Sequence, residues 1–279
     1  MPRTLSRIAF GVLVGALLVF MLFPFVWALL SSLKPSEELF ATPVRYWPDN
    51  PTLEHYRLVV ENGDFQQALL NSAIVAVSVT LMSLVLGSLA AHALGRIRFR
   101  GRSVVLYAVL AMTMFPQIAV LGALFEMVNY FRLYNQLPAL VLTYMIFTLP
   151  FTVWVMTGFM RAVPMEIEEA AYVDGATPFQ VFYKIMLPLA LPGMVTTGLL
   201  AFIAAWNEFL FALSFTQTPD KRTVTYAITA FAGSTSGMYE VPWGQTMAAS
   251  VLVTAPLVAL ALIFQRHILA GLTAGGVKG

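Results

Sequence analysis

Long apolar runs, separated by shorter polar segments, dominate the pattern of this chain. A helix needs roughly 20 mainly apolar residues to cross about 30 Å of hydrocarbon. Runs of this kind occupy six segments, at about 8–30, 69–93, 104–126, 138–160, 193–214 and 246–264. We therefore predict an all-α integral membrane protein in which residues 1–279 form a single transmembrane domain. Because the number of predicted spans is even, both termini are expected on the same side of the membrane.

Composition supports this class and excludes several others. Hydrophobic residues make up 59% of the 279 positions and charged residues 11%, and the mean hydropathy is +0.78. A soluble domain carries about a quarter charged residues. The chain has no cysteine, and its three histidines, at 55, 92 and 267, are too scattered for a ligand set, so we expect no bound metal. A net charge of +2 without a basic, aromatic-rich tract argues against nucleic acid as a partner.

Basic residues are distributed unevenly between the two predicted faces. The face with the N-terminus holds ten, namely Arg3, Arg7, Arg96, Arg98, Arg100, Arg102, Arg161, Lys184, Arg266 and Lys278. The opposite face holds six, namely Lys34, Arg45, Arg57, Arg132, Lys221 and Arg222. Lysine and arginine concentrate on the cytoplasmic side of membrane proteins, so we predict that both termini are cytoplasmic. The four arginines of 96–102 are interpreted as a stop-transfer anchor near lipid phosphates rather than as a functional site.

Prolines interrupt four of the predicted spans. Pro24, Pro116, Pro150 and Pro256 each remove a backbone donor and crowd the preceding helical turn, so we expect kinked helices. The outer loops are predicted at about 31–67 and 215–245, the second containing the flexible run of residues 233–237. Both loops are equally well explained as docking surfaces for a partner outside the membrane and as solvated connectors.

A polar, helix-forming insert, residues 161–192, separates the fourth and fifth spans. Pro164 lies near the start of a first short helix, which Gly175 ends. Thr177-Pro178 then supplies an N-cap and a first-turn proline for a second helix, which we expect Leu187-Pro188 to stop. On pattern alone, this insert is either an interfacial hairpin packed on its own bundle or a surface that fits into another protein.

One face of the first short helix is readable from its spacing. Ile167, Ala170, Ala171 and Asp174 recur at i, i+3, i+4 and i+7. Small and apolar side chains on one side of a helix at the membrane surface are typical of a packing face.

The chain contains no phosphate-binding loop of the type G-x-x-x-x-G-K-[ST], so we predict that it does not hydrolyse ATP by itself. A transport function would then draw on an ion gradient or on a nucleotide-hydrolysing partner. Glu208 is the acidic residue that lies well inside a predicted span, and such residues commonly face a cavity or a partner. Trp206, Asn207 and Glu208, with Asn71 and Gln117, are candidates for a translocation pathway, although hydrogen bonds between helices explain these polar residues equally well.

Two motifs carry a resemblance to a known family. Glu169-Ala170-Ala171, then Gly175, Ile185 and Leu187-Pro188, resembles the cytoplasmic signature of permease subunits of bacterial ABC importers, with no departure at these positions. The likeness extends over essentially the whole chain and is closest to maltose- and trehalose-type permeases. It includes Asn71-Ser72, Phe115-Pro116, Trp206-Asn207-Glu208 and the tail 265–279. The resemblance of the tail implies the shorter, six-span member of a permease pair.

The resemblance implies a type I ABC importer permease in the bacterial inner membrane. It implies that 161–192 is a coupling-helix insert, in which Glu169 contacts a cytoplasmic ATPase, Ala170 and Ala171 form the close-packed face, Gly175 is the pivot, and Asp174 supports the turn. It further implies that Gly271, Leu272, Thr273 and Lys278 of the tail reach the ATPase subunits.

The implied partners are a paralogous permease, two ATP-binding subunits and an extracytoplasmic sugar-binding protein, with membrane lipid around the chain. The implied substrate is a disaccharide such as trehalose or maltose. ATP and Mg would bind only to the partner ATPase, and this chain would hold no cofactor and catalyse no reaction. The alternative from another class is a gradient-driven secondary transporter or channel.

Overall fold

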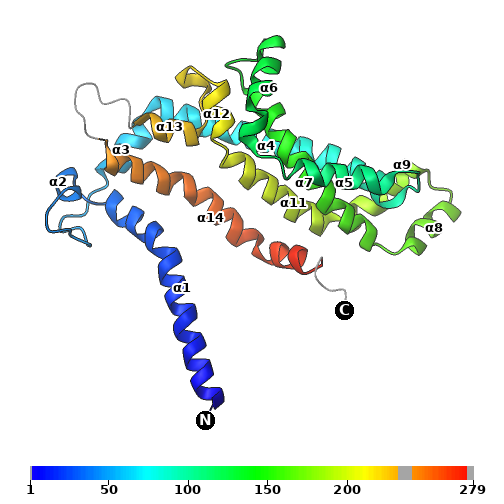
Figure 1. Ribbon diagram of the computed structural model, residues 1–279, viewed down its shortest axis with the longest axis horizontal. Coiled ribbons are helices and arrows are strands. Elements are labelled where there is room, and N and C mark those ends of the chain that lie inside the picture. Colours follow the sequence, from blue (N-terminus) through cyan, green and yellow to red (C-terminus); the bar gives the residue numbers. More distant parts are fainter. Residues whose placement is uncertain (1, 232–240, 275–279) are drawn as a thin grey trace. The chain divides into compact units, whose positions relative to one another are not determined.

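The secondary structure of the described residues is helical throughout. The computed structural model describes residues 2–231 and 241–274, with side chains for 7–231 and 241–266 (Figure 1). The elements are α1 (Pro2–Ser32), α2 (Ser36–Leu39), α3 (Glu54–Glu61), α4 (Gly63–Arg96), α5 (Arg102–Met112), α6 (Gln117–Tyr130), α7 (Leu137–Ala162), α8 (Met165–Val173), α9 (Pro178–Val181), a π-helix at Phe182–Met186, α10 (Leu187–Leu189), α11 (Leu191–Trp206), α12 (Leu210–Phe215), a 3-10 helix at Pro219–Lys221, α13 (Val224–Phe231) and α14 (Trp243–Ala274). The run 233–237 lies outside the described residues.

Four helices in the described part of the chain are long and apolar enough to cross a membrane: α1, α4, α7 and α14. They confirm the spans predicted at 8–30, 69–93, 138–160 and 246–264. Two bent pairs also qualify: α5 with α6, at 95°, and the segment Pro178–Leu189 with α11, at 75°. If each bent pair counts as one span, the total reaches the predicted six. The chain is therefore an all-α membrane protein.

Two of the predicted spans, 104–126 and 193–214, are interrupted, and the kink expected at Pro116 is confirmed. Pro116 is the N-cap of α6 and has no N–H to continue the hydrogen-bond ladder of α5, so the chain turns sharply there. In the second case α11 ends at Trp206, and α12 begins only at Leu210. Pro24, Pro150 and Pro256 lie inside continuous helices instead. The apolar pattern predicts how long a span is. It does not show where the helix within that span is interrupted, because the run stays apolar on both sides of each break.

The chain divides into two compact units, each of which has its own internal contacts. The first comprises Met1–Gln66 and Ala227–Pro256, and the second Gln67–Tyr226 and Leu257–Gly279. In the first unit the rings of Phe65 and Phe231 lie 5.9 Å apart between centroids. In the second unit α7 lies alongside α5 and α11 (Figure 1).

Glycines allow close approach between helices of the second unit. A Cβ atom at Gly87 of α4 would lie 2.5 Å from Cγ2 of Thr152 of α7, and one at Gly193 of α11 would overlap the Phe159 ring. Membrane helices have no hydrophobic driving force between them, and small residues at crossings therefore increase their van der Waals contact.

The Gly193 crossing gives a stability prediction. We expect Gly193→Ala to destabilise the protein by about 1 to 3 kcal/mol, because the added methyl group must displace the Phe159 ring. The measurement is thermal unfolding of the purified protein in detergent. Gly158→Ala on α7 is the matched control, since nothing lies within 4 Å of its Cβ position. Equal melting temperatures for the two variants would contradict the proposed crossing.

Candidate functional site

The turn at Gly175 has the geometry that ends a helix. Gly175 has φ +83°, a left-handed backbone conformation that residues with a side chain rarely adopt. The N–H of Ala176 donates to the carbonyl of Ala171 at 3.0 Å, and the N–H of Gly175 donates to that of Tyr172 at 3.1 Å. This pair of bonds is the Schellman arrangement, which satisfies the last carbonyls of α8. The predicted end of the first helix of the insert is confirmed.

The second helix of the insert begins as predicted and ends later. Thr177 forms a capping box with Gln180, in which each side chain bonds the other residue's backbone N–H. The helix then continues through the π-helix and α10 to Leu189, so Leu187-Pro188 does not stop it. It ends one residue after Pro188, at Leu189, with Ala190 as its C-cap.

The inner face of the insert packs against the bundle. A buried cluster joins side chains of α8, α9 and the π-helix to α4 and α7. Its members are Ala91, Met156, Met160, Ala171, Val181, Phe182, Met186 and Ala190, with Ile185 and Leu187 packed against them. Ala171, Ile185 and Leu187 of the signature therefore contact their own chain.

A buried ion pair reinforces this attachment. Nε of Arg96, at the end of α4, lies 3.3 Å from Oε1 of Glu168 in α8, and both side chains are only 6% exposed. Neither atom has a hydrogen bond among the described residues, so charge and burial hold the pair. The Arg96 guanidinium also donates to the carbonyl of Val163 and contacts Sδ of Met165 at 3.0 Å. The interpretation of Arg96 as a lipid anchor is wrong, because its side chain is buried against the insert.

A second arginine connects α7 to the end of α4. Arg161 donates from Nη2 to the carbonyl of Leu94 at 3.2 Å. The last carbonyls of a helix have no partner within it, and a cation there also complements the helix dipole. Arg96 and Arg161 thus join α4, α7 and α8 at one end of the second unit, where Figure 1 places α8 and α9.

The outer face of the insert is exposed. Glu169, Ala170, Asp174 and Gly175 are all accessible, and none of the ion pairs in the described chain involves Glu169. Exposed apolar side chains surround them, namely Ile167, Tyr172, Val173, Phe179 and Tyr183. Pro188 is also exposed. The two faces of α8 therefore differ: one is attached to the bundle, and the other is open to a partner.

Trp206, Asn207 and Glu208 occupy the break between α11 and α12 and point in different directions. Trp206 is 4% exposed and stacks on Phe202 with ring centroids 5.5 Å apart. Asn207 is exposed and donates from Nδ2 to the carbonyl of Ile203 at 3.0 Å. Glu208 is 9% exposed. The three side chains do not converge on one ligand.

Glu208 acts as a helix cap in this structure. Its carboxylate accepts the backbone N–H groups of Phe211 at 2.8 Å and Ala212 at 3.2 Å. Its own carbonyl accepts the hydroxyl of Thr225 at 2.7 Å. A carboxylate at the N-terminus of α12 satisfies donors that the helix leaves unpaired.

Removal of this cap gives a second stability prediction. We expect Glu208→Ala to lower the stability by about 1 to 3 kcal/mol, because two buried N–H groups lose their acceptor. Glu208→Gln keeps one acceptor oxygen and should lose less. Thermal unfolding in detergent measures both, with exposed Glu126→Ala as the control on another helix. Unchanged stability in Glu208→Ala would contradict the capping role.

Asn71 is buried and hydrogen-bonded to the loop at 220–222, whereas Gln117 is exposed. Nδ2 of Asn71 donates to the carbonyls of Asp220 and Arg222, each at 2.9 Å. The neighbouring Ser72 hydroxyl accepts the N–H of Val224 at 2.8 Å. Gln117 begins α6 with an accessible side chain. Of the five pathway candidates, only Asn207 and Gln117 present accessible amides.

Comparison with known proteins identifies the family. The model of the binding-protein-dependent transport system inner membrane component matches residues 83–273. The chain belongs to this family. It is 40% identical to the trehalose transport system permease protein SugB of Mycobacterium tuberculosis, over 92% of this chain and 93% of the relative. It is 41% identical to the trehalose/maltose transport system permease protein MalG of Thermococcus litoralis, over 96% of each chain.

A solved structure has the same fold. A chain of the crystallised bacterial ABC transporter that imports the acidic polysaccharide alginate aligns with a TM-score of 0.81 at 21% identity, covering 94% of this chain and 96% of that one. The match of the inner membrane component family includes the insert and residues 206–208, while Asn71 precedes it. Within the tail, Gly271, Leu272 and Thr273 lie in the described backbone of α14, and Lys278 lies outside the described residues.

Proposed function

We propose that this chain is the permease subunit of an ATP-driven sugar importer and forms half of its translocation pathway. The observation that carries the proposal is that the insert has one face attached to its own helices and one face exposed. Its inner face is tied to α4 and α7 by Arg96, Glu168 and the buried cluster, and its outer face leaves Glu169 accessible. Because the insert is attached to spanning helices and its outer face is accessible, a partner bound to that face can move the helices when the partner itself moves.

The partner is an ATPase on the cytoplasmic side, with the chain in the bacterial inner membrane and both termini inside. Two ATP-binding subunits hold ATP and Mg, and one docks on the surface around Glu169, Ala170, Asp174 and Gly175. Exposed Tyr172, Val173 and Phe179 supply apolar area for that contact. Closure of the ATPase dimer moves the insert, and α4 and α7 follow. The tail at Gly271, Leu272, Thr273 and Lys278 extends the same contact.

The remaining partners are a paralogous permease, which completes the pathway as a heterodimer, and an extracytoplasmic sugar-binding protein. The substrate is a disaccharide such as trehalose or maltose, which is supported by the names of two relatives that are 40% and 41% identical over 92% and 96% of this chain. Asn207 and Gln117 are the pathway residues with accessible amides. Trp206, Glu208 and Asn71 shape the pathway by fixing the break after α11 and the loop at 220–224.

The test combines purification with uptake. The chain is purified from its native host and co-eluting subunits are identified, and uptake of labelled trehalose, maltose and sucrose is then measured in proteoliposomes with ATP inside. We expect a nucleotide-binding subunit to co-elute and uptake to require ATP and the binding protein. Competition among the three sugars ranks them as substrates. Uptake by this chain alone, driven by an ion gradient, would overturn the proposal in favour of a secondary transporter or channel.

A further inference from the structure

The segment that joins α2 to α3, residues 40–53, folds back beside the end of α1 (Figure 1). The Tyr46 ring packs edge-on against the Trp27 ring of α1, with 5.9 Å between their centroids. Nζ of Lys34 lies 4.6 Å from the centroid of the same Trp27 ring and donates to the carbonyl of Arg45. Lys34 is only 2% exposed, so its charge is enclosed by these contacts. Residues 45 and 46 are therefore held at the level of Trp27.

The contact with Trp27 fixes the level of this segment relative to the membrane. Trp27 lies inside the apolar run 8–30 and one and a half turns before α1 ends at Ser32. At a rise of about 1.5 Å per residue, its Cα atom lies about 7 Å back from that end. The most apolar part of α1 has no residue buried within the described chain, as expected for a helix that faces lipid. Tyr46 therefore lies where the headgroups of a bilayer meet the acyl chains, and not in the water beyond them.

The exposed surface of this segment is aromatic and apolar. We call it the aromatic patch, and its members are Phe40, Val44, Tyr46 and Trp47, which are 57%, 59%, 63% and 72% exposed. The arginine within it, Arg45, forms an ion pair with Asp49 of the same segment. Tryptophan and tyrosine are enriched at membrane interfaces, because one part of each ring is apolar and the other carries a hydrogen-bonding group. The patch thus has the side chains that suit the level at which Trp27 places it.

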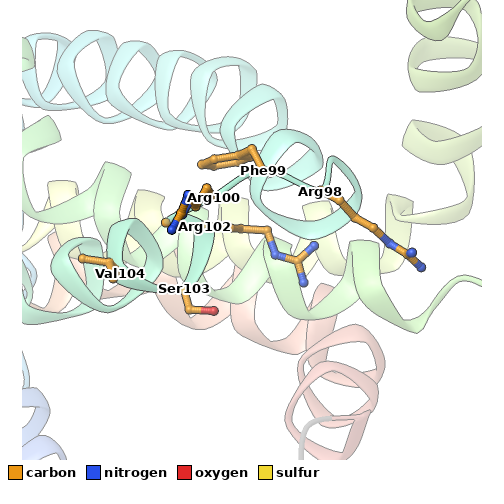
Figure 2. Close-up of a pocket in the computed structure, with 7 residues that line it drawn as sticks. Arg98, Phe99, Arg100, Arg102, Ser103 and Val104 are labelled. Atoms are coloured by element: carbon orange, nitrogen blue, oxygen red, sulfur yellow. The ribbon is translucent and has the colours of Figure 1, made fainter.

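The turn between α4 and α5 presents a different kind of surface. Figure 2 shows a pocket there in which the guanidinium groups of Arg98 and Arg100 lie on opposite sides of the turn. The four ion pairs among the described residues involve neither arginine. That turn therefore presents divergent charges, whereas the aromatic patch presents rings beside an arginine that is already paired. A partner of the patch must contact rings and methyl groups, and lipid at this level does so.

We propose that the aromatic patch inserts into the headgroup–acyl boundary of the bilayer at this end of α1. Tyr46 and Trp47 lie among the headgroups with their hydrogen-bonding atoms, and Phe40 and Val44 contact the uppermost methylene groups. Lys34 keeps the segment attached to Trp27 while it does so. Residues 40–47 thereby anchor the loop 31–67 in the membrane surface, a third role beside the solvated connector and the docking surface expected for that loop.

The test measures the depth of the patch in nanodiscs that contain the full chain with any co-eluting subunits. The chain has no cysteine, so one introduced cysteine carries an environment-sensitive nitrobenzoxadiazole label at a single site. Val44→Cys places this label in the patch. Glu54→Cys is the matched control, because Glu54 is exposed and follows Thr52, whose N–H donates to the carbonyl of Leu33 beyond the end of α1. We expect blue-shifted emission and quenching by phosphatidylcholine with a nitroxide near its headgroup at position 44, and quenching by aqueous iodide at position 54.

Substitution of Trp47 in the Val44→Cys chain tests the patch itself. Trp47 is 72% exposed, so Trp47→Ser removes little internal packing. We expect Trp47→Ser to weaken quenching by the nitroxide lipid and Trp47→Phe to preserve it, with thermal unfolding as the check that both variants are folded.

Three results would overturn the proposal. Iodide quenching at position 44 without lipid quenching would place the patch in water. Protection of position 44 from both quenchers would mean that a protein surface covers the patch. Unchanged lipid quenching in Trp47→Ser would mean that the patch does not hold the loop in the interface. The measurement needs neither ATP nor a transported solute, so its outcome is separate from that of the proposed function.

Discussion

Replacement of Glu169 by arginine is expected to abolish ATP-dependent sugar uptake while the permease remains folded and inserted. Glu169 is exposed on α8 and has no ion-pair partner among the described residues, so the substitution breaks no internal contact. A partner surface that is complementary to a carboxylate would meet a like charge instead. Reversal of a charge at such a contact costs on the order of 2 to 5 kcal/mol, which reduces occupancy of the docked state at least about 30-fold. Binding-protein-stimulated ATPase activity and uptake in the reconstituted complex measure the effect.

Glu166→Arg is the matched control for this substitution. Glu166 is also exposed and also lies in α8, but it is outside the signature that begins at Glu169. We expect Glu166→Arg to retain most of the uptake. Normal uptake in Glu169→Arg, or equal loss in both variants, would exclude a specific contact at Glu169 and leave only a general effect of charge on this face.

Removal of the Arg96 charge is expected to detach the insert. Arg96→Met leaves the Glu168 carboxylate buried without a counter-charge, which typically costs about 3 kcal/mol. Glu168→Gln should cost less, since Arg96 keeps the Val163 carbonyl as an acceptor. Thermal unfolding in detergent gives the stability change. Limited proteolysis followed by mass spectrometry reports whether cleavage increases within 161–192.

The double variant separates the ion pair from the packing around it. In Arg96→Met with Glu168→Leu both charges are absent, so we expect a smaller loss than in Arg96→Met alone. Glu166→Gln, an exposed acid of the same helix, should change neither stability nor cleavage. Glu168→Leu alone completes the cycle, and if the loss in the double variant equals the sum of the losses in Arg96→Met and Glu168→Leu, the two charges do not interact and the observed proximity has no energetic role.

Much of the fold follows from the sequence because hydrophobic length is a local property. The spans at α1, α4, α7 and α14 are continuous apolar runs, and their positions were predictable. The ends of α8 and α9 were predictable for a similar reason, since Gly175 and Thr177-Pro178 act through their own backbone and immediate neighbours. The Pro116 break was visible as a proline, but its 95° angle was not.

Other features depend on residues that are distant in sequence. The proximity of Arg96 and Glu168 arises because α4 and α7 end at the same level, and nothing in the run of four arginines distinguishes the first from the rest. Glu168 stands beside Glu169 in the sequence, yet one is buried and the other exposed, because neighbouring residues on a helix differ by about 100° in direction. Glu168 and Ala171 are three residues apart and therefore lie on the same side of α8, and this spacing was the signal for the buried face.

The roles of the pathway candidates also depend on contacts that the sequence alone does not reveal. Glu208 was notable as an acid inside an apolar run, and a polar residue there has two explanations, a ligand contact or an internal hydrogen bond. The structure gives its carboxylate two backbone donors of α12. The signal for this was present in the sequence, since an acid two residues before Leu210 is in a suitable place to cap a helix that starts there, but it required knowledge that α11 ends at Trp206.

The bond between Arg161 and the carbonyl of Leu94 has a consequence for how the protein is made. α4 is synthesised well before α7. During translation the Leu94 carbonyl in the final turn of α4 therefore lacks its donor, because Arg161 has not yet left the ribosome. The Val163 and Glu168 partners of Arg96 emerge later still. The nascent chain therefore completes this corner of its structure only after the fourth apolar run has been inserted, and we expect truncated chains that stop before it to be preferred targets of membrane quality-control proteases.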